Sequence, residues 1–62
     1  MNSPNVGDIL VDCHGNKMVV LNLLDVPGEC YVLLNGKVKL VNSMSSSIAS
    51  IVKNESVDKS IN

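Results

Sequence analysis

Two cysteines and one histidine carry the most versatile side-chain chemistry in this sequence. Cys13 and His14 are adjacent, Asp12 precedes them, and Cys30 stands alone further along the chain. Thiolates and imidazoles are ligands that zinc prefers, but structural zinc sites commonly draw them from paired motifs such as C-x-x-C. Because this chain has no such pair, the sequence predicts neither a metal site nor a cofactor. We interpret both cysteines as free thiols.

The Cys13–His14 pair also has the residue types of a thiol nucleophile and its base. Such catalysis requires the thiol within hydrogen-bond reach of the base, beside an oxyanion site and a substrate cleft. Adjacent residues on a strand point to opposite faces, so these two side chains would diverge. Four acids border the predicted strands and turns, where we interpret them as solvated turn residues: Asp8, Asp12, Asp25 and Glu29. The sequence therefore predicts no catalytic residues and a protein that is not an enzyme.

The elements that carry these residues must form one small domain. The chain has 62 residues, and Tyr31 is its one aromatic residue, so Val, Leu and Ile must build the core. A domain of this size buries only about 60% of the surface that its unfolded chain exposes. Small cores often gain stability from self-association. We therefore predict a homo-oligomer, with a heterologous protein as the alternative partner.

Charge and hydropathy narrow the classes of partner. The net charge is −1, whereas nucleic-acid-binding modules show a clear basic excess. No apolar run approaches the roughly 20 residues of a membrane span. The polar segment from Met1 to Asn5 lacks the basic and apolar regions of a signal peptide. We therefore expect a cytoplasmic protein with no membrane partner, and nucleic acid is the less favoured ligand.

Four β-prone runs separated by turn residues predict an antiparallel meander. The runs cover Ile9–Val11, Met18–Leu24, Cys30–Leu34 and Lys37–Val41. The clearest local feature is Asn35-Gly36 between the last two runs, because Asn-Gly is a preferred two-residue hairpin turn. This turn sets Leu34 opposite Lys37, and the other pairs of the hairpin follow from it.

The predicted register sorts the hairpin side chains onto two faces, because side chains alternate along a strand. One face is apolar apart from the tyrosine hydroxyl, and we assign it to the core: Tyr31, Leu33, Val38 and Leu40. The other face mixes aliphatic groups with two lysines: Cys30, Val32, Leu34, Lys37, Lys39 and Val41. We expect this mixed face to be covered in part by a helix, another sheet or another chain.

A short helix is predicted over residues 43–53. Ser43 is a suitable N-cap. The apolar residues after it recur with the spacing of one helical face: Met44, Ile48, Ile51 and Val52. Lys53 would complement the C-terminal end of the helix dipole. The single domain is thus expected to span residues 1–53, and residues 54–62 are expected to form a flexible polar tail.

The start of the domain resembles that of small SH3-like barrels, including the KOW-type modules of transcription and ribosomal proteins. The resemblance covers residues 6–41 and rests on Gly7-Asp8, Gly15 and Asn35-Gly36. It implies a mainly β fold, either a small four- to five-stranded antiparallel meander or an SH3-like barrel, here followed by the predicted C-terminal helix. The segment from Cys13 to Lys17 lacks the basic loop with which KOW modules hold RNA. The resemblance therefore supports the fold more than it supports nucleic-acid binding.

The spare apolar surfaces favour a non-enzymatic protein–protein interaction module, an oligomeric accessory or regulatory protein of bacterial or phage type. The predicted interface joins the mixed hairpin face to the apolar stripe of the helix: Cys30, Val32, Leu34, Lys37, Lys39, Val41, Met44, Ile48, Ile51 and Val52. A nucleic-acid-binding small SH3- or KOW-like barrel is the alternative function. It would depend on Lys17, Lys37 and Lys39.

Overall fold

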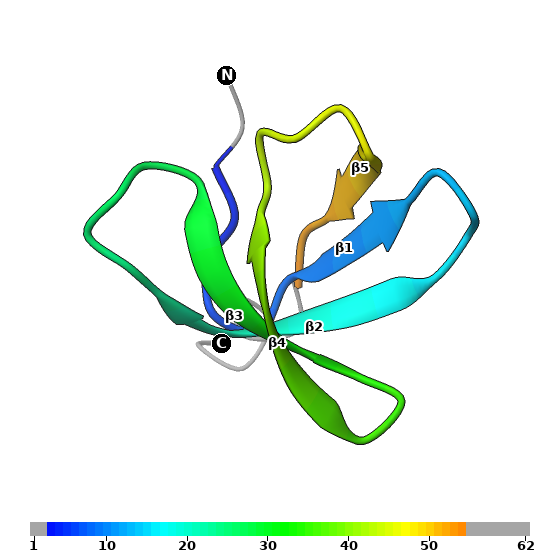
Figure 1. Cartoon of the computed structure of the whole chain (residues 1–62), viewed down its shortest axis with the longest axis horizontal. Coiled ribbons are helices and arrows are strands. Elements are labelled where there is room, and N and C mark those ends of the chain that lie inside the picture. The colour runs from blue at the N-terminus through cyan, green and yellow to red at the C-terminus, as the bar shows by residue number, and fades with distance from the viewer. Residues whose placement is uncertain (1–2, 55–62) are drawn as a thin grey trace, which may run out of the picture.

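The chain forms five strands in a computed structural model that describes residues 3–54. The strands are β1 (Ile9–Asp12), β2 (Lys17–Leu23), β3 (Glu29–Leu34), β4 (Lys37–Asn42) and β5 (Ile48–Val52). They pair antiparallel in one open sheet with the order β4-β3-β2-β1-β5 (Figure 1). The mainly β class and the four-stranded meander are confirmed. Residues 55–62 of the predicted tail lie outside the described residues.

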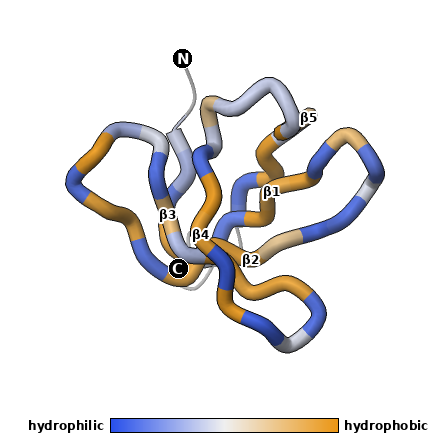
Figure 2. The backbone as a smooth tube through the Cα atoms, viewed as in Figure 1, coloured by the Kyte–Doolittle hydropathy of each residue, from blue (hydrophilic) through white to orange (hydrophobic). Residues whose placement is uncertain are grey.

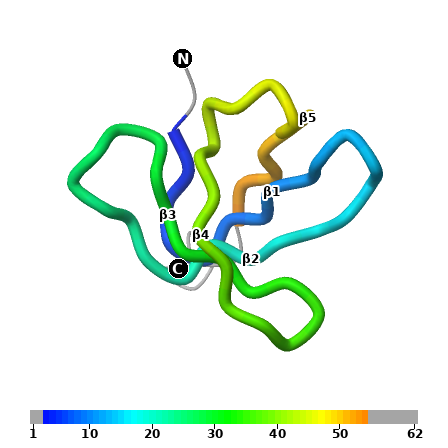
Figure 3. Tube along the Cα trace, in the orientation of Figure 1, coloured from blue at the N-terminus to red at the C-terminus, as the bar shows by residue number. Residues whose placement is uncertain are grey.

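The β3–β4 hairpin forms as its turn residues predict. Asn35 and Gly36 both have positive φ, at 54° and 78°, as in the type I′ turns that match the twist of the flanking strands. The register pairs Leu34 with Lys37 at the turn and continues to Cys30 opposite Val41 and Glu29 opposite Asn42. The predicted pairs are therefore confirmed. Figure 3 shows this tight turn and the β1–β2 and β2–β3 loops projecting outward from the middle of the view.

The predicted helix over residues 43–53 is wrong. Turns over residues 43–47 lead into β5, and the residues that the structure describes contain no helix, hence none that could cross a membrane. The Ser47 N–H donates to the Ser45 hydroxyl at 3.2 Å, and the Ile48 N–H donates to the Ser45 carbonyl at 3.0 Å. Local bonds of this kind compete with helix formation. The β-branched residues after them pair instead with β1, as Ile51 does with Leu10.

The core lies on the opposite face of the hairpin from the one predicted. The fully enclosed side chains are Leu10, Met18, Val20, Cys30 and Val32, and packed against them are the half-buried Leu34, Val41, Ile48 and Ile51. The assignment of Tyr31, Leu33, Val38 and Leu40 to the core is therefore wrong, because all four side chains are exposed.

The choice between the two faces is made by β1 and β5. Both faces of β2 are apolar, so alternation within that strand does not distinguish inside from outside. Leu10 lies opposite both Met18 and Ile51, and these three side chains share the inner face. This inner row needs β5 at the edge of the sheet, where the sequence predicted a helix.

An ion pair between a buried carboxylate and an exposed lysine joins the chain before β1 to the chain after β5. Asp8 is only 2% exposed, and its carboxylate lies 2.7 Å from the Lys53 amino group. Backbone N–H groups of Asn5 and Asn54 donate to the same carboxylate at 2.7 and 2.8 Å, and Lys53 also donates to the Ser3 carbonyl at 2.7 Å. The interpretation of Asp8 as a solvated turn acid is thus wrong.

Candidate functional site

A contiguous apolar surface covers the outer side of β2, β3 and β4. We call it the outer apolar face, and it consists of Val19, Leu21, Tyr31, Leu33, Val38 and Leu40. These side chains are between 37% and 62% exposed, whereas Val20 and Val32, their neighbours in sequence, are buried. Figure 2 shows apolar residues running through all three strands. The largest apolar patch on a soluble protein is often a functional surface, such as a binding site for another protein.

The strand register places these residues in two rows. In the first row Val19 is opposite Leu33, and Leu33 is opposite Val38. The same row continues across the sheet, because Val19 is opposite Ile9 on β1 and Ile9 is opposite Val52 on β5. Directly opposite residues in an antiparallel sheet project from the same face. The row is therefore one apolar strip across all five strands.

The second row is built around Tyr31. Tyr31 is opposite Leu40 on β4 and opposite Asn22 on β2. The register of β2 shifts between Val20 and Asn22, which makes Leu21 the extra residue of a β-bulge. Bulges often re-aim side chains, and here Leu21 stays 37% exposed. The second row thus adds an aromatic ring and two leucines to the outer apolar face.

The two ends of the outer apolar face carry opposite charges. Lys17 precedes Val19 by two residues on β2, and Glu29 precedes Tyr31 by two residues on β3. Since side chains alternate, both project from the outer side. They sit at opposite ends, because β2 and β3 run antiparallel. Neither forms an ion pair among the residues that the structure describes.

The residues of the predicted interface are divided between the core and the surface. Cys30 and Val32 are fully enclosed within one chain, and four others are half-buried against them: Leu34, Val41, Ile48 and Ile51. The exposed members are Lys37, Lys39, Met44 and Val52. The structure therefore gathers six of the eight apolar members into the core, with little surface left for a partner, and leaves Met44 and Val52 exposed.

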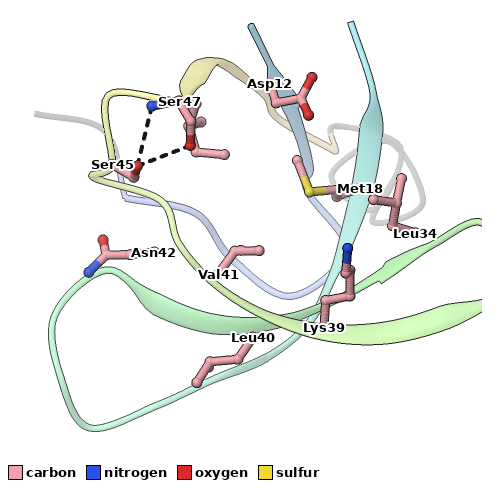
Figure 4. A pocket seen from close by; sticks show the side chains of 10 residues that line it. Asp12, Met18, Leu34, Lys39, Leu40, Val41, Asn42, Ser45 and Ser47 are labelled. Atoms are coloured by element: carbon pink, nitrogen blue, oxygen red, sulfur yellow. Dashed lines mark hydrogen bonds between the residues drawn. The ribbon is translucent and has the colours of Figure 1, made fainter. Parts of the chain in front are cut away.

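A pocket of about 420 Å³ lies between β4 and the segment that leads into β5. Its lining residues are Asp12, Met18, Leu34, Lys39, Leu40, Val41, Asn42, Ser45, Ser47 and Ile48. Figure 4 shows Val41 and the Lys39 amino group on the pocket side of β4, with Leu40 directed away. Asp12 is the one acid among these described residues, so the lining offers no second carboxylate for acid–base chemistry.

The Asp12 carboxylate is engaged in its own turn. It accepts hydrogen bonds from the Asn16 side chain at 3.0 Å, from the Asn16 backbone N–H at 2.8 Å and from the His14 backbone N–H at 2.9 Å. The bonds from Asn16 contribute most and lower the pKa of Asp12, against a smaller opposing effect of burial. Asp12 therefore holds the β1–β2 turn as a carboxylate, as Asp residues commonly do in turns.

The two thiols lie in different environments. Cys13 is exposed and Cys30 is buried, and both are free. Burial raises the pKa of the Cys30 thiol, so this thiol is a small apolar core residue rather than a nucleophile. Among the described residues no three His, Cys, Asp or Glu side chains gather where they could hold a metal ion.

The three lysines of the alternative function do not share one face. Lys17 is opposite Val11 and projects from the outer side. Lys37 is opposite Leu34 and Lys39 is opposite the buried Val32, so both project from the inner side at the edge strand β4. The aliphatic stems of Lys37 and Lys39 can cover apolar surface there while their amino groups reach water. The geometry therefore does not assemble a single basic surface.

Sequence reasoning found four of the six residues of the outer apolar face but gave them the opposite role. The alternation of Tyr31, Leu33, Val38 and Leu40 was the signal, and it identified one continuous apolar surface. The sequence pattern did not reveal the position of β5, and without β5 the inner and outer faces could not be told apart. Comparison of the chain with models of known protein families, with curated proteins and with solved structures gave no match.

Proposed function

We propose that this chain is a protein–protein interaction module, of accessory or regulatory type, that binds through the outer apolar face. The observation that carries the proposal is the exposure of six large apolar side chains on three adjacent strands. Binding that covers this surface is favoured by about 25 cal/mol for each Å² of apolar area removed from water. Because the largest apolar patch of a small protein is often functional, a binding role explains why this surface is exposed.

The composition of the outer apolar face supports this role. Tyr31 lies in the second row between Leu40 and the bulged strand β2. Aromatic residues are enriched in the cores of interfaces, where the ring supplies apolar area and the hydroxyl retains a polar contact. Charged Lys17 and Glu29 lie at the ends of the surface, as charges do at an interface rim.

The resemblance to small SH3-like barrels concerns the scaffold of this module. We propose that the curled sheet approaches closure into a barrel, since residues of both edge strands, β4 and β5, line the same pocket. A curled sheet encloses the apolar side chains of its inner face and leaves its outer face available to a partner. Slow hydrogen exchange at backbone amides on the outer edge of β4 would support closure, and fast exchange there would contradict it.

Site-specific photo-crosslinking tests the proposed function. A photo-reactive amino acid replaces Leu40 on the outer apolar face, and in the control chain it replaces Ser46, an exposed turn residue. Both chains are expressed in the cells from which the gene comes. We expect a crosslinked product of defined mass from position 40 that is absent from position 46. Equal products from both positions, or none from position 40, would contradict a binding role for this face.

A further inference from the structure

We infer that the partner on the outer apolar face is a second copy of this chain, packed face to face with its strands reversed. This inference rests on the proposed function and specifies its partner. It follows from the distribution of charge around the outer apolar face. The face is apolar along its middle, with Lys17 at one end and Glu29 at the other.

The symmetry of a face-to-face dimer decides which charges meet. The twofold axis of such a dimer must lie in the plane between the two sheets. An axis parallel to the strands would keep each end of the face against the same end of the partner, so Lys17 would approach Lys17 of the other copy. An axis across the strands reverses the partner and brings its acidic end to the basic end of the first copy. Only this second arrangement pairs Lys17 with Glu29, and it does so twice.

Both charged side chains are free to make these contacts. Lys17 is exposed and Glu29 is half-buried, and neither is in an ion pair among the residues that the structure describes. They lie on β2 and β3, which are neighbouring strands. Reversal therefore places the Lys17 of one copy over the strand next to the Glu29 strand of the other. The charges make the surface complementary to itself in one orientation.

The area of the outer apolar face indicates the strength of this dimer. The exposed fractions of its six residues amount to a patch on the order of 500 Å² on each chain. Two copies would then bury about 1,000 Å² together, below the ~1,600 Å² of a standard interface. Interfaces of this size are weak and reversible. We therefore expect a monomer–dimer equilibrium that depends on concentration rather than a permanent dimer.

A charge swap tests both the partner and its orientation. Sedimentation equilibrium at low salt measures the dimer dissociation constant of the full chain, of Lys17→Glu and of Glu29→Lys. Each single variant replaces two attractive pairs by two repulsive ones and should dimerise about tenfold more weakly. The double variant Lys17→Glu/Glu29→Lys should recover the affinity. An equimolar mixture of the two single variants should also associate more tightly than either variant alone, because every pair in the mixed dimer is attractive.

A charge change outside the outer apolar face serves as the control for these variants. Asp25→Lys changes charge in the exposed loop after β2 and should leave the dissociation constant within about twofold of the wild type. A monomer at all concentrations would overturn the inference, and so would a dimer whose affinity ignores the charge swaps. Neither result would overturn the proposed function, which fails only if position 40 gives no specific crosslink. A crosslink from position 40 to a different protein, with no dimer in sedimentation, would keep the function and reject the second copy.

Discussion

The Asp8 carboxylate shows how one buried residue can join the segment before the first strand to the segment after the last. It precedes β1, while its partners Lys53 and Asn54 follow β5. Burial on its own would raise the pKa of Asp8, but hydrogen bonds from Lys53, Asn54 and Asn5 outweigh it and lower the pKa from 3.8 to about 2. The folded state therefore favours the charged carboxylate more than the unfolded chain does.

This pKa shift predicts a loss of stability in acid. Because the folded pKa lies below the unfolded value, the contribution of Asp8 is complete above about pH 4 and is lost as the pH falls towards 2. We expect Asp8→Asn to lower the free energy of unfolding at pH 7 by about 1–2 kcal/mol and to flatten its dependence on pH between 4 and 2. Urea unfolding at several pH values measures both effects. Asp25→Asn, in an exposed loop, is the control and should change neither, and an Asp8 variant that behaves like it would contradict this role.

Two adjacent residues of β3 test which face is inside. Val32 is fully buried, and Leu33 is 39% exposed on the outer apolar face. Truncation of a buried side chain loses burial and leaves a cavity, so Val32→Ala should cost about 1.5–3 kcal/mol of unfolding free energy. Leu33→Ala should cost about 0.5–1 kcal/mol, the scale of strand preference at an exposed site. Chemical unfolding of both variants measures the difference, and a larger loss for Leu33→Ala would contradict the assignment of the core to the inner face.

At the scale of elements, strands were predicted correctly where turn residues and β-prone runs marked them in the sequence. Asn35-Gly36 predicts its hairpin and register from two residues, because few residue pairs accept positive φ twice. β5 could not be predicted in the same way. Met44, Ile48, Ile51 and Val52 fit a helical face, and only the partner strand β1 reveals that the last three belong to a strand. The inner and outer faces followed from β5, so the same missing contact reversed the candidate site.

The loop between β2 and β3 is hydrogen-bonded to the turn that follows β4. The Ser43 N–H donates to the Gly28 carbonyl at 2.7 Å, and the Met44 N–H donates to the Asn42 side chain at 2.8 Å. A Cβ atom on Gly28 would lie 2.5 Å from the Asn42 side-chain oxygen and 2.9 Å from the Met44 sulfur. Gly28 therefore permits a close approach of two connections that are distant in sequence.

Two glycines with the same backbone conformation provide a matched test of this contact. Gly28 has a φ of +87° and Gly15 a φ of +86°, but a Cβ on Gly15 would meet no atom within 4 Å. Gly15→Ala should therefore lose only the conformational term of about 1 kcal/mol. Gly28→Ala adds a steric conflict and should lose at least about 2 kcal/mol. Thermal unfolding of both variants measures the difference, and equal losses would show that the two connections are not in contact.

At the scale of the whole molecule, one sheet divides its apolar residues between a core and an exposed surface. The inner face joins all five strands around Leu10, Val20, Cys30 and Val32. The outer apolar face covers three of the same strands and has no cover among the described residues. A small chain that leaves this much apolar area outside its own core is expected to bury it against another protein. We propose that this other protein is a second copy.

Tyr31 reports on this central claim most directly, because it is the one aromatic residue of the chain and lies in the outer apolar face, 41% exposed. Acrylamide quenching of its fluorescence should be strong in dilute solution and should fall as the concentration rises and the outer apolar face is covered. Val38→Lys, which places a charge in this face, should keep Tyr31 open to quenching at every concentration. A Tyr31 that is shielded even in the most dilute solution would place the ring inside the fold and contradict the account.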